Sequence, residues 1–208
     1  YGFTLFQHNG YGSLNVAHQI NVPYSTKKPV IKMGYEEPSG LKDYWTYTSQ
    51  NVGMAGVGYI SDYTGKLTFI RNEYSLKNEL MPLSLSFYHS QTQTSTNIGY
   101  GNGWKTNYSM EVKYDSTFNL YYLINPDGNK IYFMNETCVS VNSAMQECTS
   151  TAENGSGNKL VRQSTNGQLD GYVIKTQVDI EYHFDITGRL TKIHNPKQLL
   201  SLWVYYID

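Results

Sequence analysis

The chain has 208 residues, a formal net charge of -1 and a charged fraction of 16%, against about 25% in an ordinary soluble domain. Its basic residues are scattered singly, which argues against the basic patch of a nucleic-acid-binding protein. No apolar run approaches the roughly 18 residues that a membrane-spanning helix needs, so we expect neither a nucleic-acid partner nor a membrane span in this segment. The 20 tyrosines, against 7 Phe and 3 Trp, together with frequent Asn, Ser, Thr and Gly, favour strands joined by turns.

The first 37 residues differ from the rest in their sequence pattern. Pro23 and Pro29 interrupt short β-like runs there, and proline is tolerated only at strand edges, ends and bulges. A turn-forming segment follows at residues 36–40, Glu-Glu-Pro-Ser-Gly. We therefore predict two parts, residues 1–37 and residues 38–208.

Alternating apolar and polar residues dominate the second part. Leu83, Leu85 and Phe87 alternate with polar neighbours, the pattern of an antiparallel strand with one face in water. Similar alternation predicts strands over residues 66–71, 83–88, 110–114, 120–124, 130–134, 172–176, 178–185, 190–193 and 201–207. Polar, Gly-containing stretches at 90–103 and 149–158 are interpreted as loops. The predicted fold class is all-β and mainly antiparallel.

A twelve-residue motif recurs. Residues 59–70 (YISDYTGKLTFI) and 182–193 (YHFDITGRLTKI) share Tyr, Asp, Thr, Gly, Leu, Thr and Ile at matching positions. A shorter copy begins at Tyr122, and the chain ends on a further Tyr-x-x-Asp. The residues that repeat at the turns are Tyr59, Asp62, Gly65, Tyr122, Asn125, Gly128, Tyr182, Asp185 and Gly188.

The motif has a simple physical interpretation as one β-hairpin. Tyr ends the incoming strand with its ring on a neighbour, Asp or Asn accepts backbone N–H groups to set the turn, and Gly takes the left-handed position. A lone hairpin is marginally stable in water, so the units must stack into a continuous sheet. We expect the chain to be the beginning of a longer sheet.

Cys138 and Cys148 lie ten positions apart in a polar stretch. Two interpretations stay open, a local disulfide that closes a hairpin if the protein is exported and two unrelated thiols. A metal site would need more ligands than this stretch offers, so no metal and no cofactor are expected.

The motif Tyr-x-x-Asp-x-x-Gly-Arg-Leu-Thr-x-Ile resembles the YD repeat of Rhs/YD-repeat proteins, which include bacterial wall-associated proteins and polymorphic toxins. The preceding block is similar to the entry segment found ahead of the repeats in Gram-positive surface members. It consists of Gly40-Leu-Lys-Asp-Tyr-Trp-Thr-Tyr47, Gly58-Tyr-Ile-Ser-Asp-Tyr-Thr-Gly-Lys-Leu67, Met81-Pro-Leu-Ser-Leu-Ser86 and Gly99-Tyr-Gly-Asn-Gly-Trp-Lys-Thr-Asn-Tyr108. Residues 1–37 resemble the last strands of a DNRLRE-type β-sandwich, a module type linked to polysaccharide binding.

The resemblance implies a curved sheet of β-hairpin repeats that forms part of a shell, with a few sandwich-like strands at the N-terminus. It implies a non-catalytic structural role, in which a secreted or cell-wall-associated protein encloses or helps to deliver a C-terminal toxin domain. The partners would be the downstream repeats and the cargo domain of the same chain.

The residues themselves point to no catalytic group. Asp185-Ile-Thr-Gly188 differs from the Asp-Thr-Gly of aspartic proteases by an inserted residue, and turn chemistry explains it better. The second hypothesis is a carbohydrate-binding or adhesive surface module, because flat rings stack on sugar faces. Its candidate stacking residues are Trp45, Tyr47 and Trp104; the competing interpretation is that these rings pack within the sheet.

Overall fold

The computed structural model describes residues 2–4, 19–21, 39–42, 45–76, 81, 83–91 and 97–206. The chain divides into two compact units, Tyr1–Ser39 and Gly40–Asp208. In the first unit, β1 (Gly2–Thr4) pairs antiparallel with β2 (Gln19–Asn21). The rest of the predicted sandwich tail lies outside the described residues, so that assignment stays a prediction.

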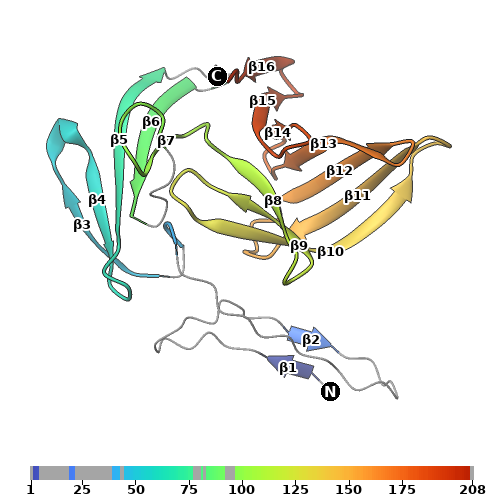
Figure 1. The fold of residues 1–208 in the computed structure, drawn as a ribbon, viewed down its shortest axis with the longest axis horizontal. Coiled ribbons are helices and arrows are strands. Elements are labelled where there is room, and N and C mark those ends of the chain that lie inside the picture. The colour runs from blue at the N-terminus through green and yellow to red at the C-terminus, as the bar shows by residue number, and fades with distance from the viewer. Residues whose placement is uncertain are drawn as a thin grey trace. The chain divides into compact units, whose positions relative to one another are not determined.

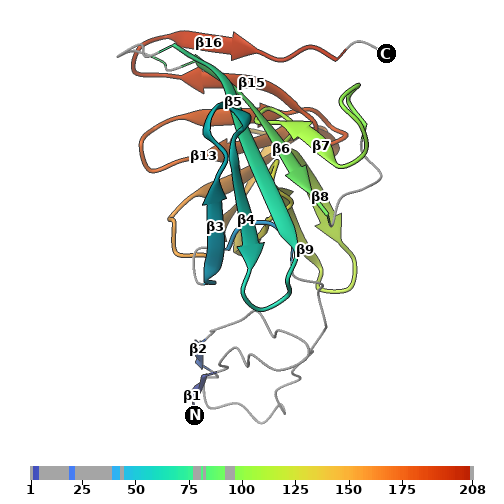
Figure 2. The same cartoon turned by 90° about the vertical axis from the view of Figure 1, so that its left-hand side faces the viewer.

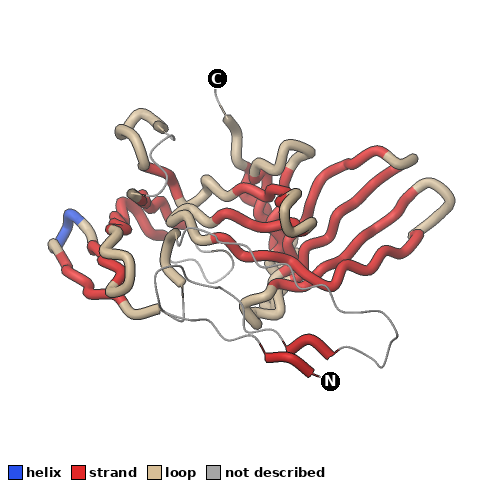
Figure 3. The backbone as a smooth tube through the Cα atoms, turned by 60° about the horizontal axis from the view of Figure 1, so that its bottom comes forward, coloured by secondary structure: helices blue, strands red, loops and turns tan. Residues whose placement is uncertain are grey.

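The second unit begins with a five-stranded antiparallel sheet in sequence order β3-β4-β5-β6-β7, whose long β5 and β6 run side by side in Figure 2. Its strands are β3 (Tyr47–Asn51), β4 (Val57–Ser61), β5 (Leu67–Leu76), β6 (Leu83–Ser90) and β7 (Trp104–Thr106). A single 3-10 turn, η1 (Gly53–Ala55), joins β3 to β4. It is the blue segment of Figure 3, and the described residues contain no α-helix.

A nine-stranded antiparallel sheet follows, again with each strand beside its neighbour in sequence, from β8 to β16. Figure 1 shows its curl from the green β8 to the red β16. The strands are β8 (Glu111–Asp115), β9 (Leu120–Ile124), β10 (Lys130–Ser140), β11 (Met145–Ala152), β12 (Lys159–Thr165), β13 (Gln168–Lys175), β14 (Glu181–Phe184), β15 (Leu190–Asn195) and β16 (Leu200–Trp203).

The nine-stranded sheet is a curled half-barrel rather than a flat layer. In a flat sheet, β8 and β14 would lie about 29 Å apart, because neighbouring strands are about 4.8 Å apart. Instead, the Val112 N–H of β8 donates to the Gly188 carbonyl, in the turn after β14, at 2.8 Å. The curl gathers side chains from eight strands into one core, whose buried members are Val112, Leu123, Phe133, Ala152, Leu160, Ile174, Phe184 and Leu190.

The predicted all-β, mainly antiparallel curved sheet is thus confirmed, and β9 coincides with the predicted strand at 120–124. Three element predictions were wrong. The predicted loop 149–158 begins inside β11, the predicted strand 178–185 starts with a turn and becomes strand only at Glu181, and the last strand ends at Trp203. Among the described residues, no helix is long and apolar enough to cross a membrane.

Candidate functional site

The last repeat turn has the predicted chemistry. Asp185 Oδ1 accepts hydrogen bonds from the Thr187 N–H at 2.8 Å, the Arg189 N–H at 3.0 Å and the Thr187 hydroxyl at 2.6 Å. Partial burial raises the pKa of this carboxyl, but the hydrogen bonds from Thr187, Arg189 and Gly188 outweigh it and lower the pKa below its ordinary value. Asp185 therefore holds this turn together as an ionised acceptor.

The first repeat turn differs despite its matching sequence. The Asp62 carboxylate accepts from the Thr48 hydroxyl of β3 at 2.8 Å, so it bonds across the sheet rather than into its own turn. Hydrogen bonds from Thr46 and Thr48 lower its pKa. The turn is held instead by Ser61, whose Oγ accepts the N–H groups of Tyr63 and Thr64 at 3.4 and 3.3 Å. The matching position before Asp185 is a phenylalanine, which has no acceptor, and this explains the difference.

The middle turn uses a third arrangement. The Asn125 N–H donates to the Asn129 carbonyl at 2.8 Å and the Gly128 N–H to the Asn125 carbonyl at 2.9 Å, the same backbone pairs as in the last turn. The side-chain acceptor is Asp127, whose Oδ1 takes the Asn129 N–H at 3.0 Å. Its Oδ2 takes the Leu41 N–H at 2.8 Å.

Asp127 thereby fixes the start of the second unit onto the β9–β10 turn. Asn129 Nδ2 donates to the Leu41 carbonyl at 3.2 Å, and Lys42 Nζ donates to the Lys130 carbonyl at 2.6 Å. Asp127 is only 8% exposed. Burial raises its pKa, although the N–H groups of Leu41 and Asn129 and the charge of Lys42 oppose that effect. Sequence patterns do not indicate this contact, because the partners are far apart along the chain.

The three repeat tyrosines lie in the incoming strands of their hairpins, but the opposed residue shifts by one motif position each time, from Thr68 to Tyr132 to Ile193. Tyr59 in β4 is opposite Thr68, and Tyr122 in β9 has its ring 5.2 Å from that of Tyr132 in the next strand. Tyr182 in β14 packs against the core, and burial raises the pKa of its hydroxyl, with a smaller contribution from Tyr108.

The cysteines form a disulfide between β10 and β11, where Cys138 and Cys148 are directly opposed. Opposed residues project to the same face of a sheet. One row of opposed residues crosses six strands in this way, in the order Cys138, Cys148, Arg162, Tyr172, Phe184 and Leu190. Since Phe184 and Leu190 belong to the core, the disulfide lies on the same concave face.

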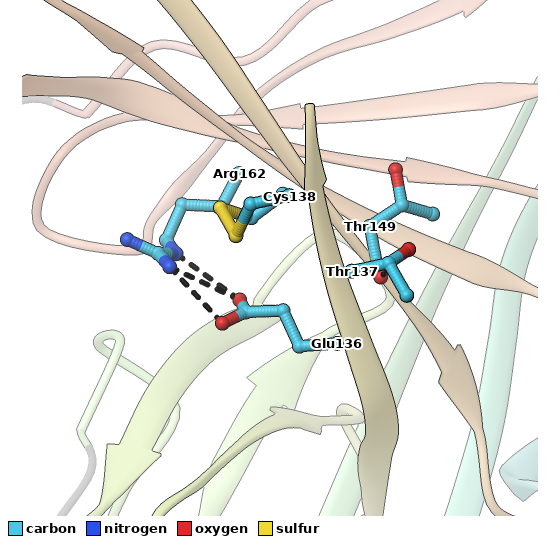
Figure 4. The surroundings of a disulfide bond; sticks show 6 residues. Glu136, Thr137, Cys138, Thr149 and Arg162 are labelled. Atoms are coloured by element: carbon cyan, nitrogen blue, oxygen red, sulfur yellow. Dashed lines mark hydrogen bonds and ion pairs between the residues drawn. A yellow bond between two sulfur atoms is a disulfide. The ribbon is translucent and has the colours of Figure 1, made fainter. Parts of the chain in front are cut away.

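Glu136 and Arg162 meet beside the disulfide (Figure 4). Arg162 Nη2 donates to both carboxylate oxygens of Glu136, at 3.1 and 3.2 Å, and Nε donates to one of them at 3.3 Å. The Arg162 guanidinium also lies 5.4 Å from the centre of the Tyr121 ring. We call the set Tyr121, Glu136, Cys138, Cys148, Arg162 and Tyr172 the concave-face cluster.

The contact between two tyrosines of this cluster reflects the curl of the sheet. Tyr121 in β9 and Tyr172 in β13 are four strands apart along the sheet, yet their ring centres are 5.6 Å apart. Burial, with a further effect of Tyr121, raises the pKa of the Tyr172 hydroxyl, while Arg162 opposes the rise. The roles of Glu136 and Arg162 and this tyrosine pairing could not be predicted from sequence, because they depend on the register between distant strands.

The three candidate stacking residues make internal contacts. Trp45 is 8% exposed and lies 6.2 Å from Tyr63, ring centre to ring centre. The Tyr47 hydroxyl accepts from the Lys42 N–H at 2.7 Å and donates to the Gly40 carbonyl at 3.2 Å. Trp104 packs against His89 and Phe69, with ring centres 5.3 and 6.2 Å away. These contacts are what packing within a sheet requires.

Taken together, these residues fix the backbone. Carboxylates close two of the repeat turns and a serine hydroxyl closes the other. The Gly188 carbonyl joins β8 to the turn after β14, and a disulfide links the two strands of one hairpin. Comparison with known proteins adds nothing to this, since no family model, no curated protein and no solved structure matches the chain.

Proposed function

We propose that this chain is a non-catalytic wall segment of an Rhs/YD-repeat type shell, in a secreted or cell-wall-associated protein that encloses or helps to deliver a C-terminal toxin domain. The family assignment rests on the recurring Tyr-x-x-Asp-x-x-Gly motif and the block that precedes it. The architecture supports it, because each hairpin lies beside the next in sequence order and the sheet curves as a wall must.

The observation that carries the proposal is the hydrogen bond from Val112 to Gly188. The glycine of the last repeat turn is placed against a strand six positions away in the sheet, so this turn fixes the curl of the nine-stranded sheet, whereas the matching Gly65 makes no such close approach. A wall built from such units bends in a defined direction, and bending is the property that enclosure demands.

Export is supported by the disulfide. Structural disulfides persist in oxidising compartments and are rare in the cytosol, and Cys138–Cys148 joins an exposed segment of β10 to a buried position of β11. Treating the native cells with a membrane-impermeant thiol reagent, with and without prior reduction, tests this. Labelling only after reduction supports export, and labelling without reduction contradicts the disulfide in the cell.

Enclosure is tested by protease protection of the natural full-length protein. The segment downstream of the repeats should resist added protease under native conditions and become cleavable when the sheet is unfolded by denaturant. Cleavage of that segment at the same rate as in its isolated form would contradict enclosure.

A further inference from the structure

The concave-face cluster contains an arrangement that the wall role does not use, and two of its three groups are the cysteines of the disulfide. Glu136, Cys138 and Cys148 place one carboxylate oxygen and two sulfur atoms within 4.8 Å of one another. Among the described residues this is the one group of three or more His, Cys, Asp or Glu side chains close enough to hold a metal ion. A tetrahedral zinc site holds such ligand atoms about 3.5–3.8 Å apart, given bonds of about 2.3 Å to sulfur and 2.1 Å to oxygen.

We propose that the reduced hairpin binds a thiophilic divalent cation, with zinc as the type case, through Cys138 Sγ, Cys148 Sγ and Glu136, leaving a fourth position for water. The disulfide and the metal are then alternative links across the same two strands. The disulfide joins them under oxidising conditions, and the metal joins them where the cysteines are reduced.

The backbone holds the ligands in place without the disulfide. Cys138 and Cys148 are opposed within a paired stretch that continues on both sides, from Thr137 opposite Thr149 to Ser140 opposite Gln146. Reduction removes one covalent bond from this ladder and none of its hydrogen bonds. The two thiols therefore stay opposite each other, which lowers the ordering cost of binding.

Charge also favours the site. Two thiolates, the Glu136 carboxylate and the Arg162 guanidinium sum to -2, which a divalent cation neutralises. Arg162 holds both oxygens of Glu136, which orients the carboxylate, as outer-shell partners of metal ligands commonly do. A positive neighbour also favours the thiolate form of cysteine.

The three ligand residues differ in their exposure to solvent. Cys148 is 3% exposed, while Glu136 and Cys138 are exposed. The ion would rest against a buried sulfur on the protein side and keep an open side to solvent. That open side leaves room for the water ligand.

The chemistry balances in two steps. A dithiol reductant transfers two electrons and two protons to the Cys138–Cys148 bond and itself becomes a cyclic disulfide. The two protein thiols then release two protons as they bind the cation as thiolates. Binding is consequently favoured by higher pH and competes with re-formation of the disulfide.

The test uses the full 208-residue chain, reduced with a dithiol under argon and freed of it by gel filtration. Co²⁺ serves as the probe, because thiolate ligands give it a charge-transfer band and four-coordination gives it strong visible absorption. The reduced chain should bind one Co²⁺ that Zn²⁺ displaces, and the oxidised chain should show no such band. Absence of the band in the reduced chain would overturn the proposal.

Two variants separate the ligand from its neighbours. Glu136→Gln should weaken Co²⁺ binding at least tenfold and diminish the four-coordinate visible absorption. Glu147→Gln is the matched control. Glu147 is adjacent to Cys148 but occupies the opposite face of the sheet, where it accepts a hydrogen bond from Gln163 Nε2 at 3.0 Å. The Glu147→Gln variant should therefore bind Co²⁺ as tightly as the wild-type chain. Equal binding by both variants would overturn the role of Glu136. Amide exchange across β10 and β11 in the reduced chain supplies a second readout, and loss of their pairing would contradict the preformed site.

Discussion

The Val112 amide donates its hydrogen bond to the Gly188 carbonyl at 2.8 Å, which brings the first strand of the nine-stranded sheet against a turn near its far end. Glu111 and Arg189 form an antiparallel bridge at the same place. The curl therefore depends on a close backbone approach, and such an approach requires a residue without a side chain.

Replacing Gly188 with alanine should destabilise the second unit by about 2–4 kcal/mol. A Cβ at this position would lie 1.9 Å from the Val112 carbonyl oxygen, and φ is +86°. The variant must lose the close contact, at about 1 kcal/mol for the hydrogen bond, and it carries left-handed strain of about 1 kcal/mol or more. Urea unfolding followed by fluorescence measures the loss.

Gly65→Ala is the matched control for that variant. Gly65 occupies the same motif position with φ +69°, and a Cβ there has no atom within 4 Å. Gly65→Ala should lower the free energy of unfolding only by the strain of the left-handed backbone, about 1 kcal/mol. If both alanine variants lose equal stability, the contact with Val112 contributes nothing.

Asp185→Ala should destabilise more than Asp62→Ala. Asp185 accepts three hydrogen bonds within its own turn, and their loss should cost about 1–2 kcal/mol at neutral pH. Asp62 is an exposed acceptor for Thr48, and Ser61 holds its turn. Chemical denaturation of the two variants checks this, and a larger loss for Asp62→Ala would contradict the assigned turn chemistry.

The pKa values of Asp185 and Asp127 should be shifted in opposite directions from the ordinary value of an aspartate. Hydrogen bonds keep the pKa of Asp185 below its ordinary value, so its stabilisation is present above that value and is lost as pH falls through the folded pKa. Burial raises the pKa of Asp127, so the folded state binds its proton more tightly and loses this stabilisation as pH rises through the folded pKa. NMR of the carboxyl carbons should show Asp127 titrating at the higher pH; the reverse order would contradict the two environments.

Trp45 and Trp203 provide a test of packing against exposure. Trp45→Ala should cost about 3–5 kcal/mol, since the ring is 8% exposed. Trp203 is 59% exposed and interacts mainly with Lys192, whose Nζ lies 5.4 Å from the ring centre, so Trp203→Ala should cost about 1 kcal/mol or less. Thermal unfolding measures both, and near-equal losses would show that Trp45 is not a packing residue.

Strands with one apolar face were predictable from sequence. Val112 and Tyr114 alternate with Glu111 and Lys113, and β8 forms there with Val112 buried. The hairpin of β10 and β11 was only half predicted, because most of β10 beyond Met134 is exposed and its Thr, Ser, Asn and Cys residues give no apolar period. Its strand structure comes from pairing with β11 rather than from burial.

The repeat motif correctly marked hairpins but did not determine how each one is held. Asp62 and Asp185 occupy equal motif positions, yet the residue before them, Ser61 or Phe184, decides whether the aspartate must close the turn. The concave-face cluster was likewise invisible, apart from its cysteines. The spacing of Glu136 and Cys138, two residues apart and therefore on one strand face, was the signal that could have linked them.

The central claim is that this chain is part of a curved, continuing wall. Electron cryomicroscopy of the natural full-length protein tests it most directly. The account predicts that the sheet continues beyond β16 into further hairpins that surround a hollow interior, with the Val112–Gly188 contact retained. A structure in which β16 remains a free edge, or in which the repeats enclose no space, would contradict it.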